Sequence, residues 1–332
     1  MRIELETGHP RLDRFLSEHL PQVPRNKWDD WIREGRVLLN GEVPSKGGKK
    51  LKAGDVIETE LPDLTPPARH MLAETIDLPT LFEDNQLWIV DKPAGMVVHP
   101  GPGHSGGTVV NALLGRIQAA LPVVEINVDD AAIDLETEEE EAPRGWPGLV
   151  HRLDRFTSGC LCLTKTKEAE LSLQSQFKER GVEKRYLAMV RHSPKLPQLG
   201  SLLIDEPILR HRIDRMRMTI GGAGRPSQTR IRVISRTPSV ALLECELLTG
   251  RTHQIRVHMQ HMRAPLLGDG LYGGPMRWQD KDKEPLELPH PFLHAWKLAV
   301  DHPISGERIS VEAQIPDEFR EIGEKLGLTL PS

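Results

Sequence analysis

The sequence predicts an α+β protein with two domains. Its 332 residues are about twice the length of a typical domain. The first part of the chain combines two helical patterns with short strands, and strand and helix signals alternate from residue 81 to the C-terminus. Hydrophobic residues make up 38% and charged residues 27% of the chain. This composition is ordinary for a globular protein and excludes a disordered chain, a collagen-like chain and a disulfide scaffold.

The first segment, 1–61, has the pattern of a small α+β domain. Apolar residues recur at helical spacing in two stretches, at Leu12, Phe15, Leu16 and Leu20 and again at Trp28, Trp31 and Ile32. Gly35 is expected to end the second helix. A strand at 37–39 then runs into an Asn40-Gly41 turn, and a further strand is expected at 56–57.

Residues 62–75 are expected to form a linker, because Pro62, Pro66 and Pro67 keep the backbone extended. The second domain is predicted over 76–325. It begins with an apolar strand at 87–90, a Gly/Pro-rich loop at 92–107 and a helix from Thr108. Later, 229–234 alternates polar and apolar residues as a half-buried strand does, with 239–248 as its partner.

Charge is unevenly distributed along the chain. The net charge is −5, yet the segment Glu125–Glu141 alone holds nine acidic residues and no Lys or Arg, so the remainder carries +4. We expect an acidic insertion at about 125–145. In contrast, 207–232 holds seven arginines and one acid. Such a field attracts a polyanion, although a solvated charged face is the commoner meaning of a charge run.

The cysteines and the length of the apolar runs indicate where the protein is located. Cys160, Cys162 and Cys245 are the three cysteines, an odd number without disulfide spacing, which favours a reducing, cytoplasmic location. No apolar run approaches the roughly 18 residues of a membrane span. The N-terminus lacks the pattern of a secretory signal. We therefore expect no membrane association.

The segment 151–159, HRLDRFTSG, is the sharpest chemical signal in the chain. Arginines on both sides of Asp154 favour its ionised form and keep it available as a nucleophile at neutral pH. The apolar residues that follow predict a strand on which this loop is mounted. An ordinary loop ion pair is the commoner meaning of such a pattern in isolation.

A second constellation, 250–258, reads GRTHQIRVH. If it is a strand, Thr252, Gln254 and Arg256 share one face, and Arg256 is offered to a carboxylate or phosphate. A solvated basic strand is the alternative. The histidines of this region and His99 and His104 match no metal-ligand spacing, so we expect no metal. There is also no Walker loop and no Gly-x-Gly-x-x-Gly loop, so no nucleotide cofactor is indicated.

Together these motifs resemble the RluA-type RNA pseudouridine synthases. Further matching motifs stand in family order, at DKPAGMVVHPG (91–101), KRYLA (184–188), PLLGD (265–269) with Tyr272-Gly273, and HAWKL (294–298). Residues 11–57 separately resemble the S-four type of RNA-binding domain. The loop and helix at 107–114 are most similar to the RluD-like subgroup, which acts on large-subunit ribosomal RNA.

The resemblance implies a catalytic domain with a mixed, largely antiparallel sheet flanked by helices. It implies isomerisation of uridine in RNA without any cofactor, and the expected RNA is large-subunit ribosomal RNA or its precursor particle. Asp154 would be the nucleophile, Tyr186 would lie against the base, and Arg256 would pair with Asp154. RNA contacts are expected from basic side chains of both domains: Arg152, Arg155, Lys92, Arg251, Arg11, Arg14, Lys27, Arg36 and Lys49. We expect a monomer.

Phe156 departs from the family pattern, which has a small acidic or amide residue there, and is expected to alter RNA contacts around the loop. Other functions stay open. The alternatives are modification of transfer RNA and a non-catalytic RNA-binding or ribosome assembly factor. A metal hydrolase built on the histidines lacks a ligand set. A glycosidase that uses Asp154 lacks an evident partner carboxylate.

Overall fold

The computed structural model describes residues 2–20, 25–59, 72–101, 104, 106–120, 148–279 and 281–331. These residues fall into two units, an N-terminal one up to residue 59 and a larger one from residue 72 onward. Most of the predicted linker, up to residue 71, and the whole acidic insertion predicted at 125–145 lie outside the described residues.

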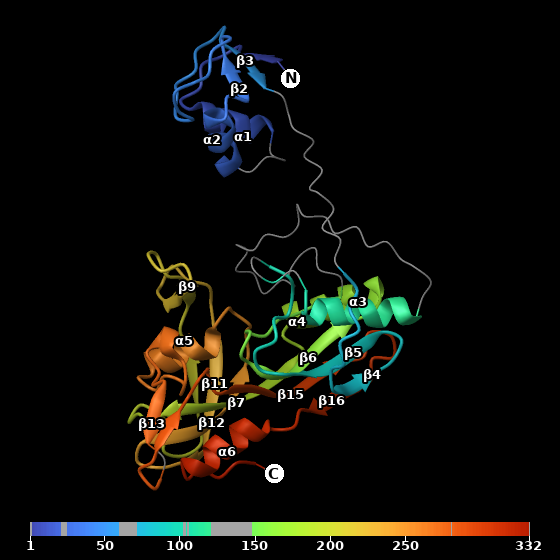
Figure 1. Ribbon diagram of the computed structural model, residues 1–332, viewed down its shortest axis with the longest axis vertical. Coiled ribbons are helices and arrows are strands. Elements are labelled where there is room, and N and C mark those ends of the chain that lie inside the picture. The colour runs from blue at the N-terminus through green and yellow to red at the C-terminus, as the bar shows by residue number, and fades with distance from the viewer. Residues whose placement is uncertain are drawn as a thin grey trace. The chain divides into compact units, whose positions relative to one another are not determined.

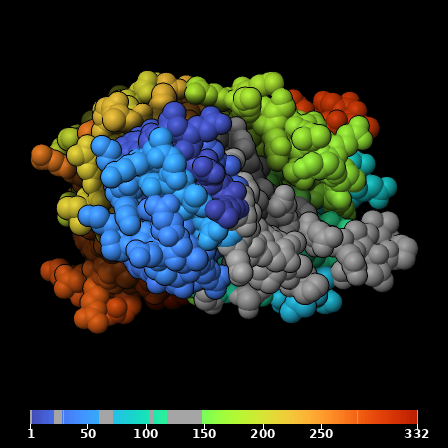
Figure 2. Space-filling view, turned by 90° about the horizontal axis from the view of Figure 1, so that it is seen from above, coloured from blue at the N-terminus to red at the C-terminus, as the bar shows by residue number. Residues whose placement is uncertain are grey.

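The N-terminal unit pairs two helices with a small antiparallel sheet of strand order β1-β3-β2. Its elements are β1 (Arg2–Glu4), α1 (Leu12–His19), α2 (Arg25–Arg33), β2 (Val37–Leu39) and β3 (Val56–Thr59). The predicted helices and the strands β2 and β3 are confirmed, whereas β1 was not predicted from the sequence. Leu12, Leu16, Trp28 and Ile57 are fully buried in its core, and Figure 2 shows the unit (blue) as one continuously packed body.

The Asn40-Gly41 turn confirms the sequence expectation. Both residues have positive φ, 55° and 82°, as the two central residues of a type I′ turn require. Leu39 and Glu42 exchange backbone hydrogen bonds across the turn. Asn40 also accepts a hydrogen bond from the amide of Val56 through its side-chain oxygen, which ties the turn to β3.

The larger unit is organised around one mixed sheet (Figure 1). In the described part of the chain this sheet has nine strands, in the order β4-β5-β6-β15-β7-β12-β11-β8 with β16 beside β15. The strands are β4 (Thr80–Glu83), β5 (Leu87–Lys92), β6 (Ser158–Thr164), β7 (Glu183–Arg191), β8 (Ser201–Asp205), β11 (Gln228–Arg236), β12 (Val240–Leu247), β15 (Leu293–Asp301) and β16 (Arg308–Glu312). All neighbouring pairs are antiparallel except β15 with β6. The predicted fold class is confirmed.

Helices cover both faces of this sheet. Leu161 and Leu163 of β6 share a core with α3 (Val109–Ala120) and α5 (Gln254–His261). Cys160 and Cys162 of the same strand pack on the other face, against α4 (Lys167–Lys178). On that second face α6 (Asp317–Lys325) covers β7 and β12. Because β6 is covered on both faces, all seven of its residues are buried, which explains its almost uninterrupted apolar sequence.

Two short hairpins complete the unit. They are β9 (Ile208–Arg210) with β10 (Met218–Ile220), and β13 (Arg277–Gln279) with β14 (Pro285–Glu287). A 3₁₀ turn, η2 (Gly270–Tyr272), follows α5. No helix in the described part of the chain is long and apolar enough to cross a membrane.

The predicted strand at 250–258 is wrong, because residues from Gln254 onward form α5. His253 precedes the helix with a left-handed backbone, φ 56°. The Gln254 side chain accepts hydrogen bonds from the Thr249 hydroxyl and the Arg251 amide, at 2.8 and 3.0 Å, and so fixes the turn that starts the helix. Ile255 and Met259, four residues apart, face the core together, a helical spacing that the alternating polar residues obscured.

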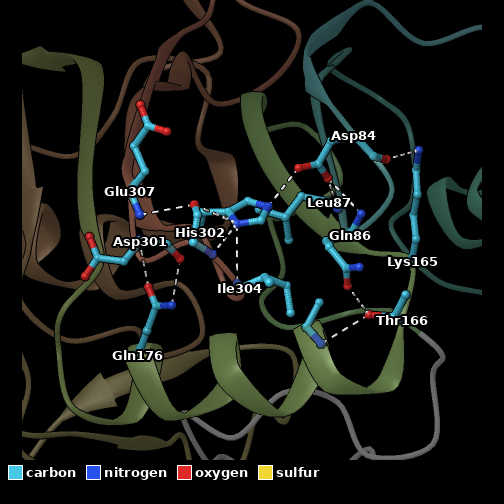
Figure 3. Close-up of polar contacts among 12 residues, drawn as sticks. Asp84, Gln86, Leu87, Lys165, Thr166, Gln176, Asp301, His302, Ile304 and Glu307 are labelled. Carbon is cyan, nitrogen blue, oxygen red and sulfur yellow. Dashed lines mark hydrogen bonds and ion pairs between the residues drawn. The ribbon is translucent and has the colours of Figure 1, made fainter.

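Away from α5, a group of polar side chains joins three segments of the sheet periphery (Figure 3). We call it the turn cluster: Asp84, Lys165, Gln176, Asp301 and His302. His302 Nε2 lies 2.7 Å from Asp84 Oδ2, which links the β15–β16 turn to the β4–β5 turn. The Gln176 side chain donates to the Asp301 carbonyl and accepts from the Asp301 amide, at 2.8 and 2.9 Å. The cluster thus fixes α4 and two turns to one another.

Candidate active site

Asp154 lies in the loop 151–157, directly before β6, as the sequence predicted. The Thr157 amide donates to the Asp154 carbonyl at 3.0 Å and turns the chain. The Arg155 carbonyl accepts hydrogen bonds from the Gly95 amide, at 2.9 Å, and from Lys92 Nζ, at 3.0 Å. The loop is therefore held by the end of β5 and by the segment that follows β5.

Gly159 allows the strand behind this loop to sit where it does. Its φ is +105°, and a Cβ at this position would lie 2.2 Å from the Ala295 carbonyl oxygen. A side chain here would push β6 away from β15, because backbone atoms at that distance cannot give way. The loop that carries Asp154 thus depends on a glycine two residues beyond Thr157.

Arg256 of α5 joins Asp154 to a second carboxylate. Its Nη1 donates to Asp154 Oδ2 at 3.0 Å. Its Nε and Nη2 bind Asp269 Oδ2 and Oδ1 at 2.7 and 2.9 Å, a bidentate pair of the kind that fixes a guanidinium plane. Only 10% of the Arg256 side chain and 1% of the Asp269 side chain are exposed, so Asp269 orients Arg256 toward Asp154.

His253 and Tyr272 complete the surroundings of Asp154. His253 Nε2 lies 3.8 Å from Asp154 Oδ2, and its Nδ1 lies 2.8 Å from the Tyr272 hydroxyl oxygen. That oxygen also accepts from the Met218 amide, at 2.8 Å. The Tyr272 hydroxyl therefore links His253 to the Met218 backbone and orients the imidazole beside Asp154.

The carboxylate is kept ionised by these neighbours. Burial raises the pKa of Asp154, but the opposing charges of His253, Arg256 and Arg152 and the hydrogen bond from Arg256 outweigh it, so the pKa lies below the ordinary value. Burial lowers the pKa of His253 in spite of the nearby Asp154 charge. The contacts of Asp154 with Arg256 and His253 both use Oδ2, and among the described residues none bonds Oδ1.

A cavity of about 540 Å³ opens beside this carboxylate. Asp154, His253 and Arg256 line it together with the exposed side chains of Arg152 and Arg155. Among the described residues no group of three or more His, Cys, Asp or Glu side chains could hold a metal ion. The cavity therefore presents one ionised carboxylate with a free oxygen among several cations, which suits a nucleophile that meets an anionic polymer.

Comparison with known proteins decides the family. The family model described as RNA pseudouridylate synthase matches residues 86–261, and the S4 domain model matches residues 10–57. The chain is 39% identical over 315 residues to an uncharacterized RNA pseudouridine synthase of Synechocystis, covering 94% of this chain and 88% of the relative. It is 36% identical over 326 residues to the ribosomal large subunit pseudouridine synthase D of Xanthomonas campestris, covering 94% and 87%.

The chain belongs to the RNA pseudouridine synthase family. The resemblance stated from the sequence and the enzyme class, an isomerase, are confirmed, and the S4 domain makes RNA its partner. The solved structure of human RNA pseudouridylate synthase domain containing 4 shares the fold, with a TM-score of 0.53 at 23% identity, covering 76% of this chain and 95% of that one.

Tyr186 of this synthase lies in β7 and is 7% exposed. The described side chains that line the cavity do not include it. Burial and the Asp154 charge raise the pKa of Tyr186 well above its usual range, so the phenol is protonated at neutral pH. The structure thus places Tyr186 within electrostatic reach of Asp154, buried and outside the cavity lining.

Lys92, which was expected to contact RNA, does not lie at the surface. It is fully buried, and its ammonium donates to the carbonyl oxygens of Pro93, Met96 and Arg155 at 2.9 to 3.0 Å. Burial lowers its pKa to about 7, against the charges of Asp154 and Asp91. In this arrangement Lys92 ties the segment after β5 to the Asp154 loop and has no surface for RNA.

The other basic residues expected to bind RNA are distributed over both units. Arg152 and Arg155 line the active-site cavity, whereas Arg251 does not and donates to the Pro226 carbonyl at 3.5 Å. Part of the 207–232 arginine field is neutralised, since Arg230 pairs with Glu246 and Arg232 with Glu244. The uneven charge of the sequence therefore overstates the basic field that RNA meets here.

In the N-terminal unit, Arg11 lines a cavity of about 390 Å³ with Arg33 and Lys46. Exposed ion pairs hold two more of the expected residues, Arg14 with Glu18 and Arg36 with Glu34. Lys49 is exposed, and the side chain of Lys27 lies outside the described part of the chain.

Asp269, His253 and Tyr272 were not assigned a role from the sequence. Asp269 and Tyr272 stood in a recognised motif, but their partners lie up to 54 residues away along the chain. One argument could have predicted a second carboxylate. If Arg256 is buried beside Asp154, its five N–H groups need further hydrogen-bond acceptors, because Asp154 alone cannot satisfy them.

Proposed function

We propose that this synthase isomerises uridine in large-subunit ribosomal RNA and that Asp154 is its nucleophile. The observation that carries the proposal is the Asp154 carboxylate, held through Oδ2 by Arg256 at 3.0 Å beside a cation-lined cavity. The relatives named ribosomal large subunit pseudouridine synthase D, at 34–38% identity, support the RNA target.

The proposed reaction follows from the charges around the carboxylate. Oδ1 of Asp154 attacks the extruded nucleotide, at the uracil ring or at the ribose, while Arg256 holds Oδ2. The bond between ribose and the ring nitrogen breaks, the uracil turns, and its C5 joins the ribose carbon. The bond between Asp154 Oδ1 and the nucleotide then breaks, which restores the free carboxylate. The proton on C5 is released and the ring nitrogen gains one, so the product is an isomer of the substrate. The depressed pKa of Asp154 keeps the attacking group ionised at neutral pH.

The supporting side chains have separate tasks in this proposal. Arg256, fixed by Asp269, positions the carboxylate. His253 lies beside Asp154 Oδ2 and is in turn oriented by Tyr272. Tyr186, buried near Asp154, packs behind the site and supports the base, and its protonated phenol does not accept the C5 proton. Arg152 and Arg155 bind phosphates that flank the extruded nucleotide, whose extrusion costs about a few kcal/mol.

Tritium release from RNA labelled at uridine C5 tests the target and the chemistry together. Unmodified large-subunit ribosomal RNA and a transfer RNA pool are offered separately to the wild-type chain. Release from ribosomal RNA, with one or a few positions mapped afterwards, is the expected result. Release from transfer RNA alone would refute the proposed target. RNA binding without release from either RNA would instead support the non-catalytic assembly factor.

A further inference from the structure

An aromatic ladder leads from the core to the mouth of the active-site cavity. Phe292 is 1% exposed and stacks on His290, with ring centres 5.3 Å apart. His290 stacks in turn on Phe156, with ring centres 5.4 Å apart and planes inclined by 5°. Phe156 is 39% exposed and lines the cavity. The ladder therefore ends on a ring that borders the space where the reacting nucleotide must lie.

This exposed ring is held rigidly. Phe156 stands between Arg155, whose carbonyl accepts two hydrogen bonds, and Thr157, whose amide closes the turn onto Asp154. Beneath it, His290 is fixed by Glu318, with His290 Nε2 3.1 Å from Glu318 Oε2. A partly exposed phenylalanine forgoes part of the burial free energy that its ring would gain in a core. A partner that covers the ring recovers that free energy.

The surroundings of the ring indicate the chemistry of the partner. The Arg155 guanidinium carbon lies 5.3 Å from the Phe156 ring centre, and Arg152 is exposed at the same cavity. A flat apolar ring with cations beside it fits a nucleotide, whose base stacks on aromatic rings and whose phosphate binds arginine. When the target uridine leaves its stack, each neighbouring base loses a stacking partner.

We propose that Phe156 stacks on the base next to the extruded uridine and replaces the partner which that base has lost. The proposal rests on the proposed function, because it requires that the nucleotide beside Asp154 be part of an RNA chain. It makes Phe156, two residues beyond the proposed nucleophile, a residue that selects and holds the flanking nucleotide.

The test measures RNA affinity without turnover. In an Asp154→Asn background, Phe156→Leu keeps an apolar side chain without a ring, and Phe156→Trp keeps a ring. Leu171→Ala, which truncates a 57% exposed side chain on α4, is the matched control. Filter binding to a large-subunit ribosomal RNA transcript is expected to show affinity about tenfold weaker for Phe156→Leu, the loss typical of one base stack. Phe156→Trp and Leu171→Ala should bind as the parent does.

Two further measurements separate stacking from packing. In the active enzyme, Phe156→Leu should raise KM about as much as it weakens binding, with a smaller change in kcat and an unchanged Tm. On a synthetic fragment around the modified uridine, removing the flanking base should weaken binding by the parent but not by Phe156→Leu.

Equal affinity of Phe156→Leu and Leu171→Ala would overturn the proposal, as would equal loss in Phe156→Trp and Phe156→Leu. Because the stack forms only on an RNA that the chain modifies, the affinities are compared on an RNA from which the wild-type chain releases tritium. A wrong RNA target would appear instead as an absence of product from ribosomal RNA with the wild-type chain.

Discussion

Two polar clusters of the larger unit are built from the same kinds of side chain but differ in what they leave unsatisfied. The active-site cluster consists of Asp154, His253, Arg256, Asp269 and Tyr272. Its central carboxylate contacts both Arg256 and His253 through one oxygen, Oδ2, and lies beside a cavity. The turn cluster is likewise centred on a carboxylate and a histidine, Asp84 and His302.

In the turn cluster both carboxylate oxygens are used. Asp84 Oδ1 accepts from the amides of Gln86 and Leu87, each at 2.7 Å, and Oδ2 is bound by His302. His302 Nδ1 accepts from the Ser305 amide at 3.0 Å. A polar network with all its groups satisfied fixes structure, whereas a network that leaves one charged oxygen beside a cavity is available for chemistry. The contrast predicts which changes affect turnover and which affect stability.

Arg256→Met is expected to have the largest combined effect, because Arg256 serves both stability and chemistry. It leaves the buried Asp269 carboxylate without its cation, and removing one partner of a buried pair typically costs about 3–5 kcal/mol of unfolding free energy. Turnover should be lost as well. Denaturant unfolding and tritium release measure the two effects. Arg256→Lys keeps the positive charge but cannot form the bidentate pair, so its stability and turnover should lie between those of the wild type and Arg256→Met. Wild-type turnover in Arg256→Met would show that Arg256 takes no part in the mechanism.

Lys92→Met should destabilise the protein less but still slow the reaction. Three carbonyl oxygens lose their donor, which we expect to cost about 1–3 kcal/mol. The loop that carries Asp154 is then free to shift, and a shift of about 1 Å can cost a hundredfold in rate. Lys165→Met in the turn cluster is the matched control: its kcat should stay near the wild-type value. A slower control would mean that loss of any hydrogen-bonded lysine impairs turnover.

Gln176→Leu probes the turn cluster alone. It removes both hydrogen bonds to the Asp301 backbone and is expected to lower the unfolding free energy by about 1–2 kcal/mol. Because Gln176 lies outside the cavity lining, kcat and KM should not change at a temperature where the variant is folded. A large change in kcat would show that the two clusters are coupled.

The smallest effect should appear in the pH dependence of stability. Burial, with a contribution from Lys184, lowers the pKa of His151 to about 3 from the ordinary 6.5. Below pH 6.5 the unfolded chain takes up this proton before the folded one does, so His151 makes stability fall as the pH drops from about 6.5 toward 3. His151→Gln keeps an acceptor for the Cys162 amide and should flatten the Tm profile between pH 7 and 5. An unchanged slope would place the acid sensitivity elsewhere.

The sequence was sufficient for the parts of the molecule that depend on neighbours along the chain. The helices of the N-terminal unit, the Asn40-Gly41 turn and the pairing of β11 with β12 all follow from local pattern. The position of Asp154 before a buried strand followed in the same way. The resemblance to a family supplied the pairing of Asp154 with Arg256, which lie 102 residues apart.

Contacts between distant residues could not be predicted in this way. The predicted strand at 250–258 failed because the alternation of polar residues was read without the cap that Gln254 makes with Thr249. The sequence predicted that Lys92 is an exposed cation that contacts RNA. Its burial depends on a hydrogen bond to the Arg155 carbonyl, 63 residues away along the chain, and no local pattern indicates that bond. His302 and Asp84 are separated by 218 residues, so no local pattern indicates the turn cluster.

The central claim is that the two carboxylates have different tasks, and the same substitution at each tests it directly. Asp154→Asn and Asp84→Asn both replace a carboxylate with an amide of equal size. The account predicts that Asp154→Asn loses at least about a thousandfold in tritium release with a Tm close to wild type. Asp84→Asn, whose amide group faces the His302 N–H, should lower the Tm and keep wild-type kcat. Wild-type release by Asp154→Asn would contradict the account.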